Sequence, residues 1–213
     1  MPFEDRHEAG RLLARSLEHL RGQPNTIVLA LPRGGVPVAY EIARALDLPL
    51  DIFLVRKLGA PGHEELAMGA LTSDGTTVFN ADVIHDLGIS QDTIANTIAR
   101  ERVELERREQ LYRAGQPPLS LEGQTVIFID DGLATGATMR AAVRALRPIA
   151  HRVIVAIPVG AASTCNELAR EADEVICLAT PEPFGAVGIF YHNFSQTTDD
   201  EVRTLLAQSR QPA

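Results

Sequence analysis

The sequence has few cysteines and no long apolar run. Its two cysteines, Cys165 and Cys177, do not have the spacing of a metal-binding motif. No apolar stretch approaches the roughly 20 residues that span a bilayer, and the charged N-terminal residues 1–7 lack a signal-peptide core. We therefore expect a cytoplasmic protein that does not insert into a membrane, with Cys177 as a buried thiol in an apolar run.

Positive charge is also scarce. The chain has 20 Lys and Arg residues against 28 Asp and Glu residues, which gives a formal net charge of −8. This balance argues against broad nucleic-acid binding, although a local basic patch remains compatible with it. A hydrophobic fraction of 45% and a charged fraction of 23% are typical of a soluble globular protein. The 213 residues fit one domain, 1–213, without internal repeats.

The most informative stretch runs from Thr125 to Met139. Val126–Ile129 are apolar and β-branched or aromatic, which predicts a buried strand. Asp130 and Asp131 follow where that strand should end, and ligands of open α/β sheets bind at the carboxyl ends of strands. The next residues offer flexible backbone, exposed N–H groups and two hydroxyls before a helix, which is typical of a phosphate-binding loop. This loop consists of Gly132, Leu133, Ala134, Thr135, Gly136, Ala137 and Thr138.

Strand and helix patterns alternate along the chain. The predicted strands are 26–31, 51–55, 126–129, 152–158 and 174–178, and the predicted helices are 4–21, 36–46, 140–147 and 163–171. This order predicts an α/β fold with an open, mainly parallel five-stranded sheet and helices on both faces. A β-hairpin is expected at 67–72 and 76–80. A helical insertion at about 81–118 contains a helix over 90–113, and a small hood at about 180–197 precedes a final helix capped by Thr198.

Two further loops carry charge at predicted strand ends. Arg33, Gly34 and Gly35 follow the first strand, and Arg56 and Lys57 follow the second. Glycine allows close approach of the backbone to a ligand, and arginine supplies a fixed charge with several donors. Because carboxyl ends of parallel strands share one sheet edge, these loops should face the acidic pair. The arrangement suits a ligand with two anionic groups flanking hydroxyls.

Two common nucleotide-binding motifs are excluded. A P-loop needs a Lys after its second glycine, and none follows Gly136. A dinucleotide fingerprint needs Gly-x-Gly-x-x-Gly after the first strand, and the segment Arg33–Val36 lacks that spacing.

The stretch Thr125–Met139 resembles the phosphoribosyl-pyrophosphate (PRPP) motif of the type I phosphoribosyltransferases, and the chain looks most like a bacterial branch of that family with an extra helical insertion. The resemblance implies that Leu133–Thr138 bind the 5′-phosphate of PRPP. Asp130 and Asp131 would bind the ribose hydroxyls, with Mg²⁺ bridging ribose and pyrophosphate oxygens. Arg33, Gly34, Gly35 and Lys57 would meet the pyrophosphate, as a basic residue at positions 56–57 often does in the family.

The same resemblance implies a flexible loop at 58–70 that closes over the site, without a regular element. Within it, His63, Glu64 and Glu65 are the candidates for proton transfer. The hood would select the acceptor, with Phe184 or Val187 against a planar base. The insertion would support the flexible loop or a homodimer contact.

One departure concerns the acceptor. Members that act on 6-oxopurines carry an aspartate just before Thr-Gly, and this chain has Ala134. The acceptor, a nucleobase or similar nitrogen nucleophile, and the general acid or base therefore stay open. Two hypotheses follow: an Mg²⁺-dependent enzyme that transfers phosphoribose and releases pyrophosphate, or a PRPP-sensing regulator that binds without turnover. Action on another sugar phosphate is a third.

Overall fold

Five parallel strands form the central sheet of the computed structural model, which describes residues 2–210 apart from the side chains of Glu64 and Glu65. Their order across the sheet is β2-β1-β6-β7-β8. The predicted open parallel sheet is confirmed, with each strand close to its expected position. The strands are β1 (Thr26–Ala30), β2 (Leu50–Ile52), β6 (Thr125–Ile129), β7 (Arg152–Val159) and β8 (Glu174–Ala179).

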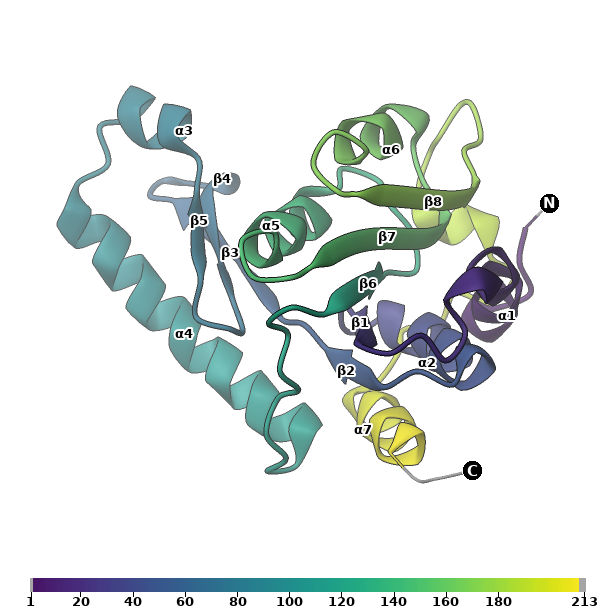
Figure 1. Cartoon of the computed structure of the whole chain (residues 1–213). Coiled ribbons are helices and arrows are strands. Elements are labelled where there is room, and N and C mark those ends of the chain that lie inside the picture. Colours follow the sequence, from purple (N-terminus) through teal and green to yellow (C-terminus); the bar gives the residue numbers. More distant parts are fainter. Residues whose placement is uncertain (1, 211–213) are drawn as a thin grey trace.

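Helices cover both faces of this sheet, as predicted (Figure 1). One face packs on α1 (Arg6–Ser16), α2 (Gly35–Leu46) and α7 (Asp199–Ser209), and a short 3₁₀ turn, Glu18–Leu20, follows α1. The other face packs on α5 (Ala137–Leu146) and α6 (Ala162–Leu168).

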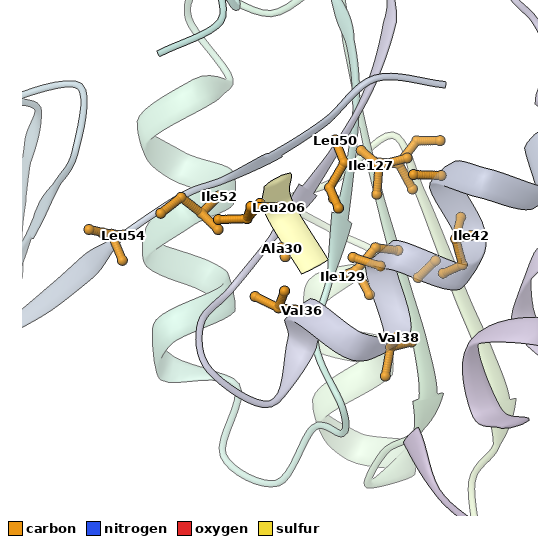
Figure 2. Close-up of a cluster of buried hydrophobic side chains, with 14 of the residues drawn as sticks. Ala30, Val36, Val38, Ile42, Leu50, Ile52, Leu54, Ile127, Ile129 and Leu206 are labelled. Atoms are coloured by element: carbon orange, nitrogen blue, oxygen red, sulfur yellow. The ribbon is translucent and has the colours of Figure 1, made fainter. Parts of the chain in front are cut away.

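Successive strand residues point to opposite faces, so each strand contributes to two cores. Val28 and Ala30 join the first cluster, drawn in Figure 2, whereas Ile27 and Leu29 join the second. Burial on both faces explains why these strands are continuously apolar.

A second, antiparallel sheet lies between α4 (Gln91–Arg113) and α5 (Figure 1). It consists of β3 (Val55–Ala60), β4 (His63–Thr72) and β5 (Thr77–Phe79). The predicted hairpin is confirmed as β4–β5. The expectation that residues 58–70 lack regular structure is wrong, because the cross-strand pairing of β3 with β4 leaves only a tight turn at Pro61 and Gly62. Arg56 and Lys57 therefore lie within a strand and not in a loop after β2.

The insertion contains α3 (Ala81–Asp86) and α4, and the N-cap of α4 is Ser90, whose Oγ accepts from Thr93 N at 3.2 Å. The expected helix over 90–113 is thus observed. The cap of the final helix is also observed, with Thr198 Oγ1 accepting from Glu201 N at 3.1 Å. Between them, the hood forms one 3₁₀ turn, Val187–Phe190.

The expectation of a free thiol at Cys177 is wrong. Cys177 on β8 forms a disulfide with Cys165 on α6, and Cys177 is only partly buried. The cytoplasmic location, which drew on free thiols, stays a prediction. Over the described part of the chain, none of the helices combines the length and apolar character needed to cross a membrane.

Candidate functional site

The predicted phosphate-binding loop is attached to the sheet at two points. Leu133 N donates to Val159 O at 2.9 Å, and Ala161 N donates to Leu133 O at 2.9 Å. Leu133 is buried, so it anchors the loop to the end of β7. Thr164 Oγ1 on α6 donates to Ala134 O at 2.7 Å, which holds the middle of the loop. These bonds fix the loop backbone without using the side chains predicted to bind a ligand.

The remaining groups of the loop face outward. Ala134, Thr135, Ala137 and Thr138 are exposed, and Gly136 turns the chain into α5 with a φ of +68°. Among the residues that the structure describes, the amide N–H groups of Thr135 to Thr138 donate to no other residue. Unpaired N–H groups and the positive end of a helix dipole favour an anion. The geometry therefore suits a phosphate at the start of α5.

The loop after β1 lies directly against the acidic pair. A Cβ added to Gly34 would collide with the carboxylate of Asp131, and one added to Gly35 would lie 2.6 Å from Ile129 O. Glycine is therefore required at both positions by close approach. The structure thus brings Gly34 and Gly35 together with Asp130 and Asp131 at the ends of adjacent strands, as the sequence predicts.

The two carboxylates have an unfavourable environment for charge. Burial, and then repulsion from Asp131, raises the pKa of Asp130 well above its usual range. Burial also raises the pKa of Asp131, against the opposing effect of the Arg6 guanidinium. Asp131 N donates to Asp130 Oδ1 at 2.9 Å. Two crowded carboxylates of this kind favour a ligand that carries positive charge or hydroxyl donors.

Arg6 is the main site residue that the sequence reasoning missed. Its Nε lies 2.8 Å from Asp131 Oδ2, and its Nη1 donates to Ser195 O at 2.8 Å. Its guanidinium carbon is 3.9 Å from the ring centroid of Phe194. Tyr191 OH donates to Asp131 O at 2.5 Å. One cation therefore connects α1, the acidic pair and the C-terminal part of the hood.

A signal for Arg6 was present in the sequence. It lies on the same helical stripe as Ala9 and Leu13, which are fully buried. An arginine on an apolar stripe is rarely buried without an acidic partner.

Arg33 is held at the edge of the site by α7. Its Nη1 lies 3.7 Å from Asp199 Oδ1, which also accepts from Tyr112 OH at 2.7 Å. Burial, followed by the bond to Asp199, raises the pKa of Tyr112 to about 12, so its hydroxyl stays a donor. Asp199 and Tyr112 therefore orient Arg33, a role that only the folded chain reveals.

Arg56 is oriented toward α4. Its Nη2 lies 2.6 Å from Glu101 Oε2. Arg56 also borders a cavity of about 30 Å³ together with Pro32 and Thr138, so it neighbours the phosphate-binding loop. Lys57 borders a larger cavity on the α4 side.

None of the three candidates for proton transfer is assigned as the general acid or base. His63 is exposed at the start of β4. The side chains of Glu64 and Glu65 lie outside the described residues.

The hood meets the site through Val187. A Cβ on Gly132 would collide with the side chain of Val187, so the two residues are in contact at the base of the phosphate-binding loop. Phe184 instead stacks on Phe190, with ring centroids 5.5 Å apart. Of the two predicted base-contacting residues, Val187 is the one in contact with the loop.

The acidic pair fits part of a magnesium site. Carboxylate oxygens are suitable ligands, and Mg²⁺ commonly takes only one or two of them plus substrate oxygens. Among the described residues, no group of three or more His, Cys, Asp or Glu side chains could hold a metal ion. Asp130 and Asp131 could therefore hold Mg²⁺ only together with a ligand that supplies further oxygens.

A family model described as phosphoribosyl transferase domain matches residues 5–163, more than half of the chain. The chain belongs to this family. The predicted family is thereby confirmed, whereas the transferase activity stays a prediction. The match includes Arg6, the loop at residues 33–35 and the whole stretch Thr125–Met139.

Similar proteins agree with the assignment. A Mycobacterium tuberculosis (strain H37Rv) protein, provisionally named a phosphoribosyl transferase, is 45% identical over 205 residues, which cover 96% of this chain and 46% of that protein. The chain thus spans about half the length of this relative. A bifunctional protein PyrR of Chloroflexus aurantiacus is 28% identical over 145 residues, covering 67% of this chain and 74% of that protein.

A solved structure shares the fold of nearly the whole chain. The crystal structure of TT1426 from Thermus thermophilus is 41% identical in sequence, with a TM-score of 0.87. The superposition covers 98% of this chain and 99% of that chain, so it includes the helical insertion.

Proposed function

We propose that the chain transfers the 5-phosphoribosyl group of PRPP to a nitrogenous base and releases pyrophosphate. One observation carries the proposal: the Gly34–Gly35 backbone lies against Asp131, next to a loop whose N–H groups and hydroxyls are exposed. An anion-binding backbone, an acidic pair and a second anion-binding loop thus follow one another along one sheet edge. This order corresponds to pyrophosphate, ribose hydroxyls and 5′-phosphate.

Each group of residues would bind the part of PRPP that suits its chemistry. The N–H groups and hydroxyls of Thr135 and Thr138 would bind the 5′-phosphate. Asp130 and Asp131 would accept hydrogen bonds from the ribose hydroxyls and stabilise positive charge that develops on the ribosyl carbon. Arg33 and the Gly34–Gly35 backbone would bind the pyrophosphate.

In the reaction, the bond between the ribosyl carbon and the pyrophosphate oxygen breaks. A bond from that carbon to a base nitrogen forms, and the base loses a proton. When bound, Mg²⁺ would neutralise charge on the pyrophosphate. Val187, which contacts Gly132, would contact the acceptor.

The decisive experiment measures pyrophosphate release with PRPP and Mg²⁺ in the presence of adenine, guanine, hypoxanthine, xanthine, uracil or orotate. Release that depends on one base supports the enzyme and names the acceptor. Binding of PRPP without turnover on any base favours the alternative, a PRPP-sensing regulator.

Asp130→Asn is the appropriate site variant. Asp131→Asn would also leave the buried Arg6 without its carboxylate, so a loss of activity would be ambiguous. Asp130 has no such partner among the described side chains. We expect Asp130→Asn to lower kcat/KM at least about a hundredfold. Asp86→Asn, at an exposed carboxylate on α3, is the control and should be neutral. Wild-type kinetics in Asp130→Asn would exclude the assigned role.

A further inference from the structure

Thr164 is a buried residue of α6 that contacts the predicted phosphate-binding loop with both branches of its side chain. Its hydroxyl donates to Ala134 O at 2.7 Å. A Cβ added to Gly136 would lie 2.5 Å from Thr164 Cγ2, so the methyl group of Thr164 packs against Gly136. Only 7% of Thr164 is exposed, whereas Ala134 and Thr135 are exposed. Thr164 therefore supports the loop from its buried side.

The bond to Ala134 O also fixes the direction of the next amide group. The peptide bond between Ala134 and Thr135 is trans, and in a trans peptide unit the C=O and the N–H point in opposite directions. Because the carbonyl of Ala134 is directed toward the buried Thr164, the N–H of Thr135 is directed away from α6. In the described part of the chain this N–H has no acceptor. One hydroxyl thus determines where one exposed amide donor points.

The position of α6 is itself well defined, on the same face of the sheet as α5 (Figure 1). Cys165, the residue after Thr164, is bonded through a disulfide to Cys177 on β8. A Cβ added to Gly160 would lie 2.7 Å from Cys165 Sγ and 3.2 Å from Leu133 Cβ, so α6 and the loop are closely packed at the end of β7. The hydroxyl of Thr164 is therefore presented to the loop from a fixed support.

We propose that Thr164 is a positioning residue for the 5′-phosphate: by holding Ala134 O, it aims the N–H of Thr135 at the phosphate. A donor that is already oriented loses less freedom when the anion binds, which increases affinity. Thr164 lies just beyond residues 5–163, which the family model matches. The role rests on the proposed function, because it takes the loop as the site of the 5′-phosphate.

The test compares two replacements of Thr164. Thr164→Val keeps the methyl contact with Gly136 and removes the hydroxyl, whereas Thr164→Ser keeps the hydroxyl and removes the methyl group. Thr26→Val is the matched control, because Thr26 is also buried and its hydroxyl also donates to a backbone carbonyl, Pro24 O, at 3.4 Å. Thr26 begins β1, at the sheet edge opposite the loop. Thermal melts check that each variant is folded.

Ribose 5-phosphate and inorganic pyrophosphate are titrated separately into each protein by calorimetry, in the presence of Mg²⁺. We expect Thr164→Val to bind ribose 5-phosphate about tenfold more weakly than the wild type, because one hydrogen bond to the phosphate loses its orientation. Its affinity for pyrophosphate should stay the same, since that ligand is assigned to Arg33 and the Gly34–Gly35 backbone. Thr164→Ser and Thr26→Val should bind both ligands as the wild type does.

Three results overturn the positioning role. The first is an unchanged affinity of Thr164→Val for ribose 5-phosphate. The second is an equal loss for both ligands, which indicates general damage to the fold. The third is a loss in Thr164→Ser as large as that in Thr164→Val, because the hydroxyl would then not be the cause.

Turnover of PRPP is measured separately, so the two proposals fail in different ways. Turnover by the wild type, together with unchanged affinity in Thr164→Val, refutes only the role of Thr164. A selective loss of ribose 5-phosphate binding without turnover on any base supports the role of Thr164 and refutes the enzyme activity. Absence of ribose 5-phosphate binding to the wild type refutes the positioning role and the assignment of the loop to the 5′-phosphate.

Discussion

Replacement of Arg6 by Met should cost far more stability than the loss of an ordinary surface arginine. The Arg6 and Asp131 side chains are only 11% and 15% exposed and lie 2.8 Å apart. Removing one partner of a buried ion pair leaves the other charge uncompensated, at a cost of about 3–5 kcal/mol. Methionine keeps much of the packing on Phe194, and both groups retain some contact with solvent. We therefore expect the low end, about 3 kcal/mol.

The assay is urea unfolding at pH 7, followed by a thermal melt. For a chain of this length, about 3 kcal/mol corresponds to a decrease of about 6–12 °C in melting temperature. Arg11→Met is the matched control, because Arg11 is on the same helix, is 53% exposed and lies 3.8 Å from Glu41. We expect the control to lose at most about 1 kcal/mol.

A double-mutant cycle tests the cause. In Arg6→Met/Asp131→Asn, neither charge is left buried alone, so the combined loss should fall short of the sum of the single losses by at least about 1 kcal/mol. Additive losses, or an Arg6→Met loss no larger than that of the control, would refute the claim that Arg6 compensates Asp131.

Three further outcomes follow from the site. Asp130→Asn should raise the melting temperature at pH 7, by about 2–4 °C for each kcal/mol of stability gained. The pKa of Asp130 is raised in the folded state, so ionisation of this carboxyl destabilises the fold as pH rises through that pKa. The gain from Asp130→Asn should therefore shrink in melts at more acidic pH. Gly34→Ala should cost about 1–3 kcal/mol in urea unfolding because its Cβ would collide with Asp131, and a neutral result would contradict the close approach. Tyr112→Phe should lower the free energy of unfolding by about 0.5–1.5 kcal/mol, because the hydrogen bond to Asp199 is lost. The loss should be the same at pH 6 and pH 9, since the pKa of Tyr112 is raised to about 12. A loss that changes between these pH values would contradict the raised pKa.

Local patterns were sufficient for the central sheet and for its acidic pair. Val126–Ile129 are predicted as a doubly buried strand because both faces of a parallel sheet are covered by helices. Asp130 and Asp131 follow this strand directly in the sequence, so they must lie at its carboxyl end. The same patterns failed at β3, where Gly59 and Pro61 suggested a loop. Pairing with β4 and contact with α4 stabilise that strand, and neither is visible within a short window of sequence.

The sequence by itself therefore determined the family, the parallel sheet, the acidic pair and the position of the predicted phosphate-binding loop, because each depends on residues that are neighbours in the chain. Only the tertiary structure decided which charges pair. Arg6 meets Asp131 across 125 residues, and Glu101 meets Arg56 across 45 residues. An ion pair depends on separation and burial in space, and neither follows from spacing along the chain. For that reason the acidic pair was predictable, whereas the cation that compensates it was found only in the folded protein.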